Sequence, residues 1–150
     1  MRRSIALLAF VTTLGCASGG GGSEPVAPAS PEETVEQFLD AVSATSLETL
    51  AELWGTSSGP AADRMEEGEL LKRLGVIIVY LQHERYEITP STDALLRGTG
   101  NERRVRAQLF RSGCTPVVPF TLTRWRDRWL VSDIDLLPIG NPARSCEPAP

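Results

Sequence analysis

The sequence is poor in the residues on which most recognisable active sites depend. It holds one histidine, His83, and three cysteines, none of them in a C-x-x-C pair. A phosphate-binding loop, a dinucleotide fingerprint and an H-E-x-x-H motif are all absent, and no sequence pattern pairs His83 with a particular serine or aspartate. The sequence therefore predicts no catalytic residue, no metal site and no cofactor.

The sequence also lacks an apolar run long enough to cross a bilayer. The longest such run, residues 5–14, has about ten residues, whereas a membrane-spanning helix needs about twenty. Because the run follows the basic pair Arg2 and Arg3, it is typical of a secretory signal that is removed after export. We therefore expect residues 1–15 to be a signal peptide rather than part of the folded protein.

Positive charge is in short supply, and it is unevenly distributed. The net charge is −4, and removal of Arg2 and Arg3 with the signal lowers it to −6, which argues against a nucleic-acid partner. Residues 24–69 contain eleven acidic residues and one basic residue, Arg64. Residues 97–128 contain eight arginines and two acidic residues, Glu102 and Asp127. Two interpretations stay open: solvated helix and strand faces, or an arginine-bearing sheet face that meets an anionic ligand or partner.

The signal ends in Thr13-Leu14-Gly15-Cys16, which resembles the lipobox of bacterial lipoproteins. The resemblance implies cleavage before Cys16, a diacylglyceryl group on its thiol, and stable attachment to a membrane. It further implies a location in the cell envelope, facing the periplasm, and Ala17 favours the outer membrane because it replaces the aspartate of inner-membrane retention signals. The alternative is an ordinary secretory signal with an incidental cysteine.

Residues 16–30 follow as a glycine-, serine- and proline-rich stretch with almost no large apolar side chain, so we expect a flexible tether. The exported compartment oxidises thiols, and Cys114 and Cys146 are the two cysteines that the anchor leaves over. We therefore predict a disulfide between them. It would hold residues 139–150, a proline-rich tail, against the domain.

Helices are expected in the first half of the remaining chain. Ser30 and Glu33 form a capping-box pattern ahead of apolar residues at helical spacing, and Thr45 with Glu48 predicts a second helix that ends at Gly55. Residues 70–81 predict a third helix, although the β-branched run 76–79 equally suits a buried strand.

Beyond residue 84 the apolar spacing changes to two, which predicts strands over residues 86–88, 104–109, 118–122 and 129–136. A hairpin turn at residues 126–128 would set Trp125 and Trp129 opposite each other as a cross-strand pair. The last strand changes phase, and we expect a bulge near Ser132 to reconcile its two halves. Helices followed by antiparallel strands predict the α+β class.

This order of elements, from the opening helix P-E-E-T-V-E-Q-F-L-D-A-V to the closing R-D-R-W-L-V-S-D-I, resembles the nuclear transport factor 2-like superfamily over residues 31–138. More narrowly, it resembles small bacterial lipoproteins that carry such a domain. The resemblance implies a curved antiparallel sheet that wraps around the helices as a cone and leaves a cavity. Some members use that cavity for catalysis and others for binding only, so the fold does not decide the function.

We expect a noncatalytic protein that binds a small ligand or an envelope protein, with a homodimer through the sheet face as a further possibility. The alternative is an enzyme of the ketosteroid isomerase-like or polyketide cyclase-like type, with His83 or the Asp133 and Asp135 pair as acid or base. For His83 the competing interpretation is a solvated helix end, and for the aspartates it is an exposed strand face. The ligand-binding candidates are Tyr86, Arg104, Arg106, Trp129 and Asp133.

Overall fold

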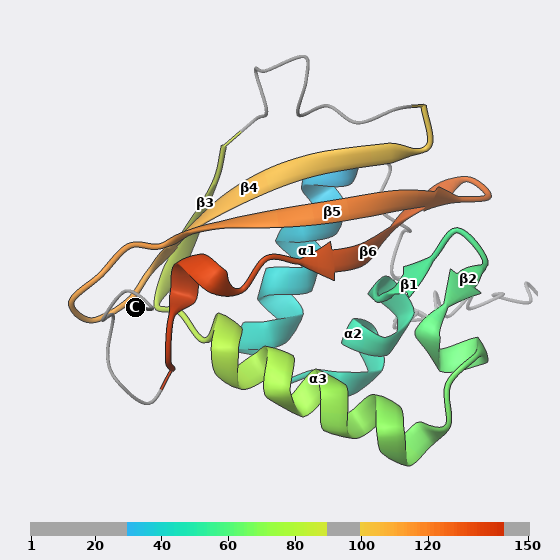
Figure 1. The fold of residues 1–150 in the computed structure, drawn as a ribbon, viewed down its shortest axis with the longest axis horizontal. Helices are drawn as coiled ribbons and strands as arrows, with labels where there is room; N and C mark the ends of the chain where they lie inside the picture. The colour runs from blue at the N-terminus through green and yellow to red at the C-terminus, as the bar shows by residue number, and fades with distance from the viewer. Residues whose placement is uncertain (1–29, 90–99, 143–150) are drawn as a thin grey trace, which may run out of the picture.

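The computed structural model describes residues 30–89 and 100–142, and within them the chain folds into the α+β class predicted from the sequence. Helices pack against one face of a four-stranded antiparallel sheet, and a short hairpin lies between the second and third helices (Figure 1). The elements are α1 (Pro31–Ser43), α2 (Leu47–Leu53), β1 (Gly55–Thr56), β2 (Gly59–Pro60), η1 (Ala61–Asp63), α3 (Glu67–Leu81), β3 (Arg85–Thr89), β4 (Glu102–Phe110), β5 (Val117–Trp125), β6 (Arg128–Ile134) and η2 (Leu137–Ile139).

The first helix begins as predicted. The Ser30 hydroxyl accepts from the backbone N–H of Glu33, and the Glu33 carboxylate accepts from the backbone N–H of Ser30, so the capping box is complete. Two of the N–H groups that every helix leaves unpaired at its start are thereby satisfied.

The second helix differs from the prediction at both ends. Ser46, not Thr45, is the residue that precedes it, because Thr45 adopts a left-handed backbone (φ 54°) that turns the chain between α1 and α2. The helix ends at Leu53, and Trp54 is already extended because it pairs in parallel with Val131 at the edge of the sheet. Tertiary pairing therefore shortens the helix that the apolar spacing predicts.

The third segment is a helix throughout, and the strand alternative for residues 76–79 is wrong. Ile77 and Ile78 are buried, whereas Val76 and Val79 are more than half exposed. In a strand, successive side chains point to opposite faces, so buried and exposed residues would alternate. Here the two buried residues are adjacent, which fits one face of a helix.

The strand order is β3-β4-β5-β6, all antiparallel, and one face of this sheet carries the core. We call the face that meets the helices the inner face. Phe120 of β5 packs edge-on against Phe38 of α1, with ring centroids 6.3 Å apart. Six apolar inner-face residues of β4 and β5 are at most 1% exposed: Val105, Ala107, Leu109, Val118, Phe120 and Leu122.

The predicted bulge is confirmed. Thr121 pairs with Asp133 but its neighbour Leu122 pairs with Val131, so Ser132 is the extra residue, and its hydroxyl donates to the Thr121 carbonyl oxygen at 3.1 Å. The extra residue changes the phase of the strand, so that both Val131 and Ile134 reach the inner face.

The predicted tryptophan pair is wrong. The turn between β5 and β6 has two residues, Arg126 and Asp127, so Trp125 lies opposite Arg128 and Trp129 lies opposite Arg124. A shift of one residue changes the face of the sheet, so the two indoles lie on opposite faces. Trp125 instead has the guanidinium groups of Arg126 and Arg128 at 4.5 and 5.0 Å from its ring centroid.

Several predictions fall outside the described residues: the signal peptide 1–15, nearly all of the tether 16–30, the lipidated Cys16, and Cys146 with most of the tail 139–150. Cys114 is described: it is half-buried in the turn between β4 and β5 and is disulfide-bonded. The disulfide between Cys114 and Cys146 stays a prediction.

Candidate functional site

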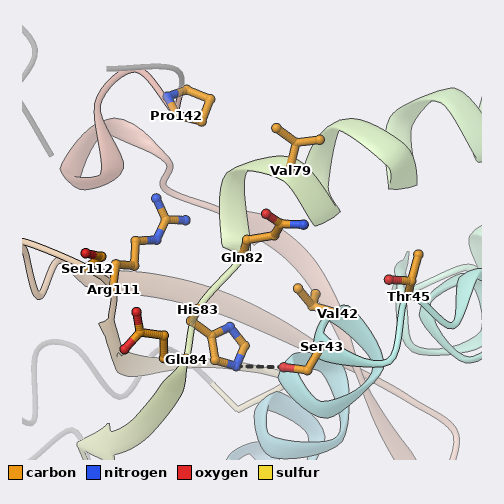
Figure 2. A pocket seen from close by; sticks show the side chains of 10 residues that line it. All are labelled: Val42, Ser43, Thr45, Val79, Gln82, His83, Glu84, Arg111, Ser112 and Pro142. Carbon is orange, nitrogen blue, oxygen red and sulfur yellow. Dashed lines mark hydrogen bonds between the residues drawn. The ribbon is translucent and has the colours of Figure 1, made fainter. Parts of the chain in front are cut away.

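A cavity of about 440 Å³ lies where the C-terminal ends of α1 and α3 approach the start of β3 and the turn after β4 (Figure 2). We call it the helix-end cavity. Val42 and Leu81 are the last buried residues of the two helices, so both apolar patterns stop at this place and leave polar chain ends around it. The lining residues are Val42, Ser43, Thr45, Val79, Gln82, His83, Glu84, Arg111, Ser112 and Pro142.

His83 lies between α3 and β3, and both of its ring nitrogens have hydrogen-bond partners. Nδ1 lies 2.7 Å from the carbonyl oxygen of Leu81, and because a carbonyl only accepts, Nδ1 carries a hydrogen. In the neutral ring Nε2 is then the acceptor, and it lies 3.0 Å from Oγ of Ser43, the last residue of α1, whose hydroxyl donates to it. A serine hydroxyl therefore points at the imidazole (Figure 2), and a backbone carbonyl holds the orientation of that ring.

Arg111 directly follows β4, and its Nη2 donates to the carbonyl oxygen of Tyr80 in the last turn of α3. Burial lowers the pKa of its guanidinium. Nε is buried and has no hydrogen-bond partner among the described residues, and no carboxylate of those residues lies within ion-pairing distance. The guanidinium therefore lines the cavity with its charge uncompensated and with part of its donor capacity unused.

Tyr86, a predicted ligand-binding residue, does not line this cavity, although its ring meets that of His83 edge-on with centroids 5.4 Å apart. Its hydroxyl donates to Asp40 Oδ1 at 2.9 Å. Burial first, and then the hydrogen bond and negative charge of Asp40, raise the pKa of Tyr86 well above its ordinary value. Its hydroxyl therefore joins β3 to α1.

A second cavity, of about 470 Å³, lies on the opposite side of the sheet and brings three predicted ligand-binding residues together: Arg104, Arg106 and Asp133. We call it the outer-face cavity. Arg104 of β4 pairs with Thr121 of β5, and Thr121 pairs with Asp133 of β6. Arg104, Thr121 and Asp133 therefore lie in one row across three strands. All three charged residues are exposed, and the remaining lining residues are Pro119, Thr121, Ile134, Asp135 and Leu136.

Trp129, the fifth predicted residue, lies apart from both cavities. It is buried at the hairpin end of the inner face, where the guanidinium groups of Arg103 and Arg124 lie 5.6 and 5.9 Å from its ring centroid. The predicted ligand-binding residues are thus distributed over three places: one joins β3 to α1, one lies in the core, and three share the outer-face cavity.

Sequence reasoning missed the Ser43–His83 pair because forty residues separate its members and no motif connects them. It also wrongly excluded the nucleophile pattern G-x-S-x-G, which the pentapeptide Gly55-Thr56-Ser57-Ser58-Gly59 fits. That pattern requires a strand, a sharp turn and a helix, whereas here it spans the turn of the β1–β2 hairpin with Ser57 exposed. Ser57 therefore lies in the motif but not in the strand–turn–helix context that the motif requires. Ser43 belongs to no motif, but it has a base, His83, within hydrogen-bond distance.

Two further features of the described residues bear on the site. No group of three or more histidine, cysteine, aspartate or glutamate side chains is placed there to hold a metal ion. Among the same residues, no helix combines the length and the hydropathy that crossing a membrane requires.

Comparison with known proteins adds no family to this geometry: no family model, no curated protein and no solved structure matches the chain.

Proposed function

We propose that this chain is a lipid-anchored protein of the bacterial cell envelope whose domain binds a small anionic ligand in the helix-end cavity. The observation that carries the proposal is Arg111, whose charge lacks a carboxylate among the described residues and whose Nε lacks a partner. A guanidinium presents its donors in a planar fork that matches a carboxylate or a phosphate. An anionic group of the ligand would compensate the charge of this guanidinium, which lines the cavity.

The rest of the lining suits a ligand with both a polar and an apolar part. Val42, Val79 and Pro142 supply apolar surface, whereas Thr45, Gln82 and Ser112 supply hydroxyl and amide groups. The one carboxylate that lines the cavity belongs to Glu84, which is exposed and therefore screened by solvent. A concave site with apolar walls and a few convergent polar groups is the usual form of a small-molecule site.

The envelope location is part of the same proposal and rests on the lipobox-like Gly15 and Cys16. A lipid on Cys16 would attach the protein to the outer membrane, facing the periplasm, and residues 16–30 would separate the domain from the head groups. We further propose that the domain is of the nuclear transport factor 2-like type. Helices that precede a four-stranded antiparallel sheet and cover one of its faces support this assignment.

The enzyme alternative of the ketosteroid isomerase-like type has less support. It needs an acid or a base inside the cone, between the helices and the inner face. The apolar inner-face side chains of β4 and β5 are at most 1% exposed, and among the described residues Thr34 is the one fully buried polar side chain. Its hydroxyl donates to the Ser30 carbonyl oxygen at 2.8 Å, so it serves the start of α1.

Arginine side-chain NMR tests the proposal. The chain with Cys16→Ser, which prevents lipidation, is labelled with ¹⁵N and titrated with succinate and with phosphate. Because Nε of Arg111 is buried, its N–H signal should be observable, and we expect it to shift saturably with at least one of the two anions. Arg111→Gln should weaken that binding, followed by the backbone amide signals of the cavity residues, by about tenfold or more, as loss of a hydrogen bond to a charged group does.

The matched control is Arg106→Gln, which removes one arginine from the outer-face cavity and should leave the titration unchanged. Arg111→Lys keeps the charge without the planar fork and guards against a folding defect in the glutamine variant. Unchanged affinity in both Arg111 variants, or equal loss in Arg106→Gln, would contradict the proposal. An anion-insensitive Arg111 signal would do the same.

A further inference from the structure

The helix-end cavity also holds the parts of a nucleophilic site, and we propose that Ser43 and His83 form a hydrolytic pair that cleaves small carboxylic esters. The activity goes beyond ligand binding, and it rests on the proposed function only in the choice of substrate. If it exists, it overturns the expectation of a noncatalytic protein.

The geometry of the pair carries the proposal. A serine hydroxyl is a weak nucleophile until a base takes its proton, and the base must lie within hydrogen-bond reach. Oγ of Ser43 lies 3.0 Å from Nε2 of His83, and the other ring nitrogen donates to the Leu81 carbonyl oxygen at 2.7 Å. That second hydrogen bond leaves Nε2 as the acceptor in the neutral ring, which is the tautomer that a general base needs.

The position of the two residues permits attack. Ser43 is exposed and His83 is half-buried, and both line the same cavity, so a ligand in the cavity can reach Oγ without displacing a packed side chain. The Leu81 carbonyl belongs to the last residue of α3, whose oxygen has no partner within the helix. It can therefore hold the imidazole and stabilise the positive charge that the ring gains.

The reaction would take two steps. Oγ of Ser43 attacks the carbonyl carbon of the ester, its proton passes to Nε2 of His83, and the alcohol leaves with that proton when the carbon–oxygen bond breaks. Water then attacks the acyl–serine ester with His83 again accepting the proton. The carboxylic acid is released and Ser43 regains its hydrogen, so the net reaction is ester plus water to acid plus alcohol.

The other lining residues indicate the class of ester. Arg111 favours a substrate with an anionic group, and Val42, Val79 and Pro142 favour an apolar part. The amide of Gln82 also lines the cavity, and in this proposal it would donate to the negative oxygen that develops during the attack. The structure thus assigns to this cavity a small ester that carries a carboxylate or a phosphate.

Covalent labelling tests the pair directly. The full chain with Cys16→Ser is incubated with a neutral alkyl fluorophosphonate, which reacts with an activated serine by forming an Oγ–P bond and releasing fluoride and a proton. We expect one added group, located by peptide mapping at Ser43, and we expect His83→Gln to slow its formation by about 100-fold. Ser57→Ala is the matched control, because it removes the serine of the G-x-S-x-G pentapeptide, and it should not change the labelling.

A pair of chromogenic esters tests turnover and its dependence on charge. 3-Carboxy-4-nitrophenyl acetate carries the anionic group, and 4-nitrophenyl acetate lacks it. We expect Ser43→Ala to lower kcat/KM for both esters by about 100-fold or more, whereas Arg111→Gln should remove a preference of about tenfold for the anionic ester. Thermal unfolding of each variant shows whether it is folded.

The two proposals fail in different ways. Absent labelling at Ser43, labelling that His83→Gln leaves unchanged, or hydrolysis that survives Ser43→Ala overturns the hydrolytic pair, even where succinate or phosphate still binds. Labelling and hydrolysis that persist without any anion preference support the pair, and they count against the binding proposal instead.

Discussion

The two faces of the same sheet differ in what they bury and in what they present. On the inner face, Val105, Ala107 and Leu109 of β4 lie beside Val118, Phe120 and Leu122 of β5 and are covered by helices. On the outer face, the alternate residues of the same strands include Arg104 and Arg106, both exposed. The alternation that makes one face apolar places the charges on the other.

This difference indicates where function is to be sought. The inner face is the place where a cone-shaped domain would hold a ligand, yet its side chains are packed like any other protein interior. The polar groups that line the helix-end cavity lie elsewhere, where helices and strands end. Arg111 and the Ser43–His83 pair both lie where a helix or a strand stops.

The largest effect should come from the centre of the inner face. Phe120 is fully buried and packs against Phe38, so Phe120→Ala removes a ring and leaves a cavity, which lowers the free energy of unfolding by about 3–5 kcal/mol. Thr121→Ala, one residue along on the outer face, should change it by at most about 0.5 kcal/mol. Chemical denaturation measures the free energy of unfolding of both variants. Similar losses of stability at the two positions would contradict the difference between the two faces.

Tyr86 lies where the inner face reaches the edge of the core, and a substitution there tests the hydrogen bond at that edge. It pairs with Leu109 in the register, but its hydroxyl reaches the edge of the core and donates to Asp40. Tyr86→Phe removes that hydrogen bond and should lower the free energy of unfolding at pH 8 by about 1 kcal/mol. Adding Asp40→Asn to the Tyr86→Phe variant should then have little further effect, because the partner of the carboxylate is already gone.

The pH dependence has a definite sign. Burial and Asp40 raise the pKa of Tyr86 in the folded chain, so the folded state keeps the phenol proton at a pH where the unfolded state has lost it. This contribution is fully present below the ordinary tyrosine pKa of about 10 and is lost as the pH rises above it, by at most about 1.4 kcal/mol per pH unit. Denaturation at pH 8 to 11 should show a steeper decline in the wild type than in Tyr86→Phe, and parallel curves would refute the coupling.

The parts of the fold that were predictable rest on local signals. The capping box at Ser30 and the bulge at Ser132 each follow from a few neighbouring residues, and the structure confirms both. The errors arose where a distant contact or an unusual backbone decided the outcome. Trp54 leaves α2 to pair with Val131, and Arg126 adopts a left-handed backbone (φ 53°) that shortens the last hairpin turn to two residues.

The candidate site was less predictable because helix ends, not motifs, assemble it. Apolar spacing places the last buried residues, Val42 and Leu81, to within a turn. It carries no information on how the end of α1 and the end of α3 lie relative to each other, so the contact of Ser43 with His83 could not be read from it. Arg111 appeared in the sequence only as one of many arginines. Arg128 shares its unpaired, buried Nε, and what distinguishes Arg111 is that it also lines the helix-end cavity.

The smallest effect on stability should come from the outer face, where a variant also tests for a homodimer through the sheet face. Arg106→Glu changes an exposed side chain and should alter the free energy of unfolding of the monomer by at most about 0.5 kcal/mol. Because Arg106 and Asp133 line one cavity, a second copy rotated by 180° can set each arginine against an aspartate of its partner. Light scattering over a range of concentrations should then show that Arg106→Glu weakens association and that adding Asp133→Arg restores it. If the protein is a monomer at every concentration, the outer face is a solvated surface and not a dimer interface. If Arg106→Glu lowers the free energy of unfolding of the monomer by more than about 1 kcal/mol, both faces of the sheet contribute to the packing.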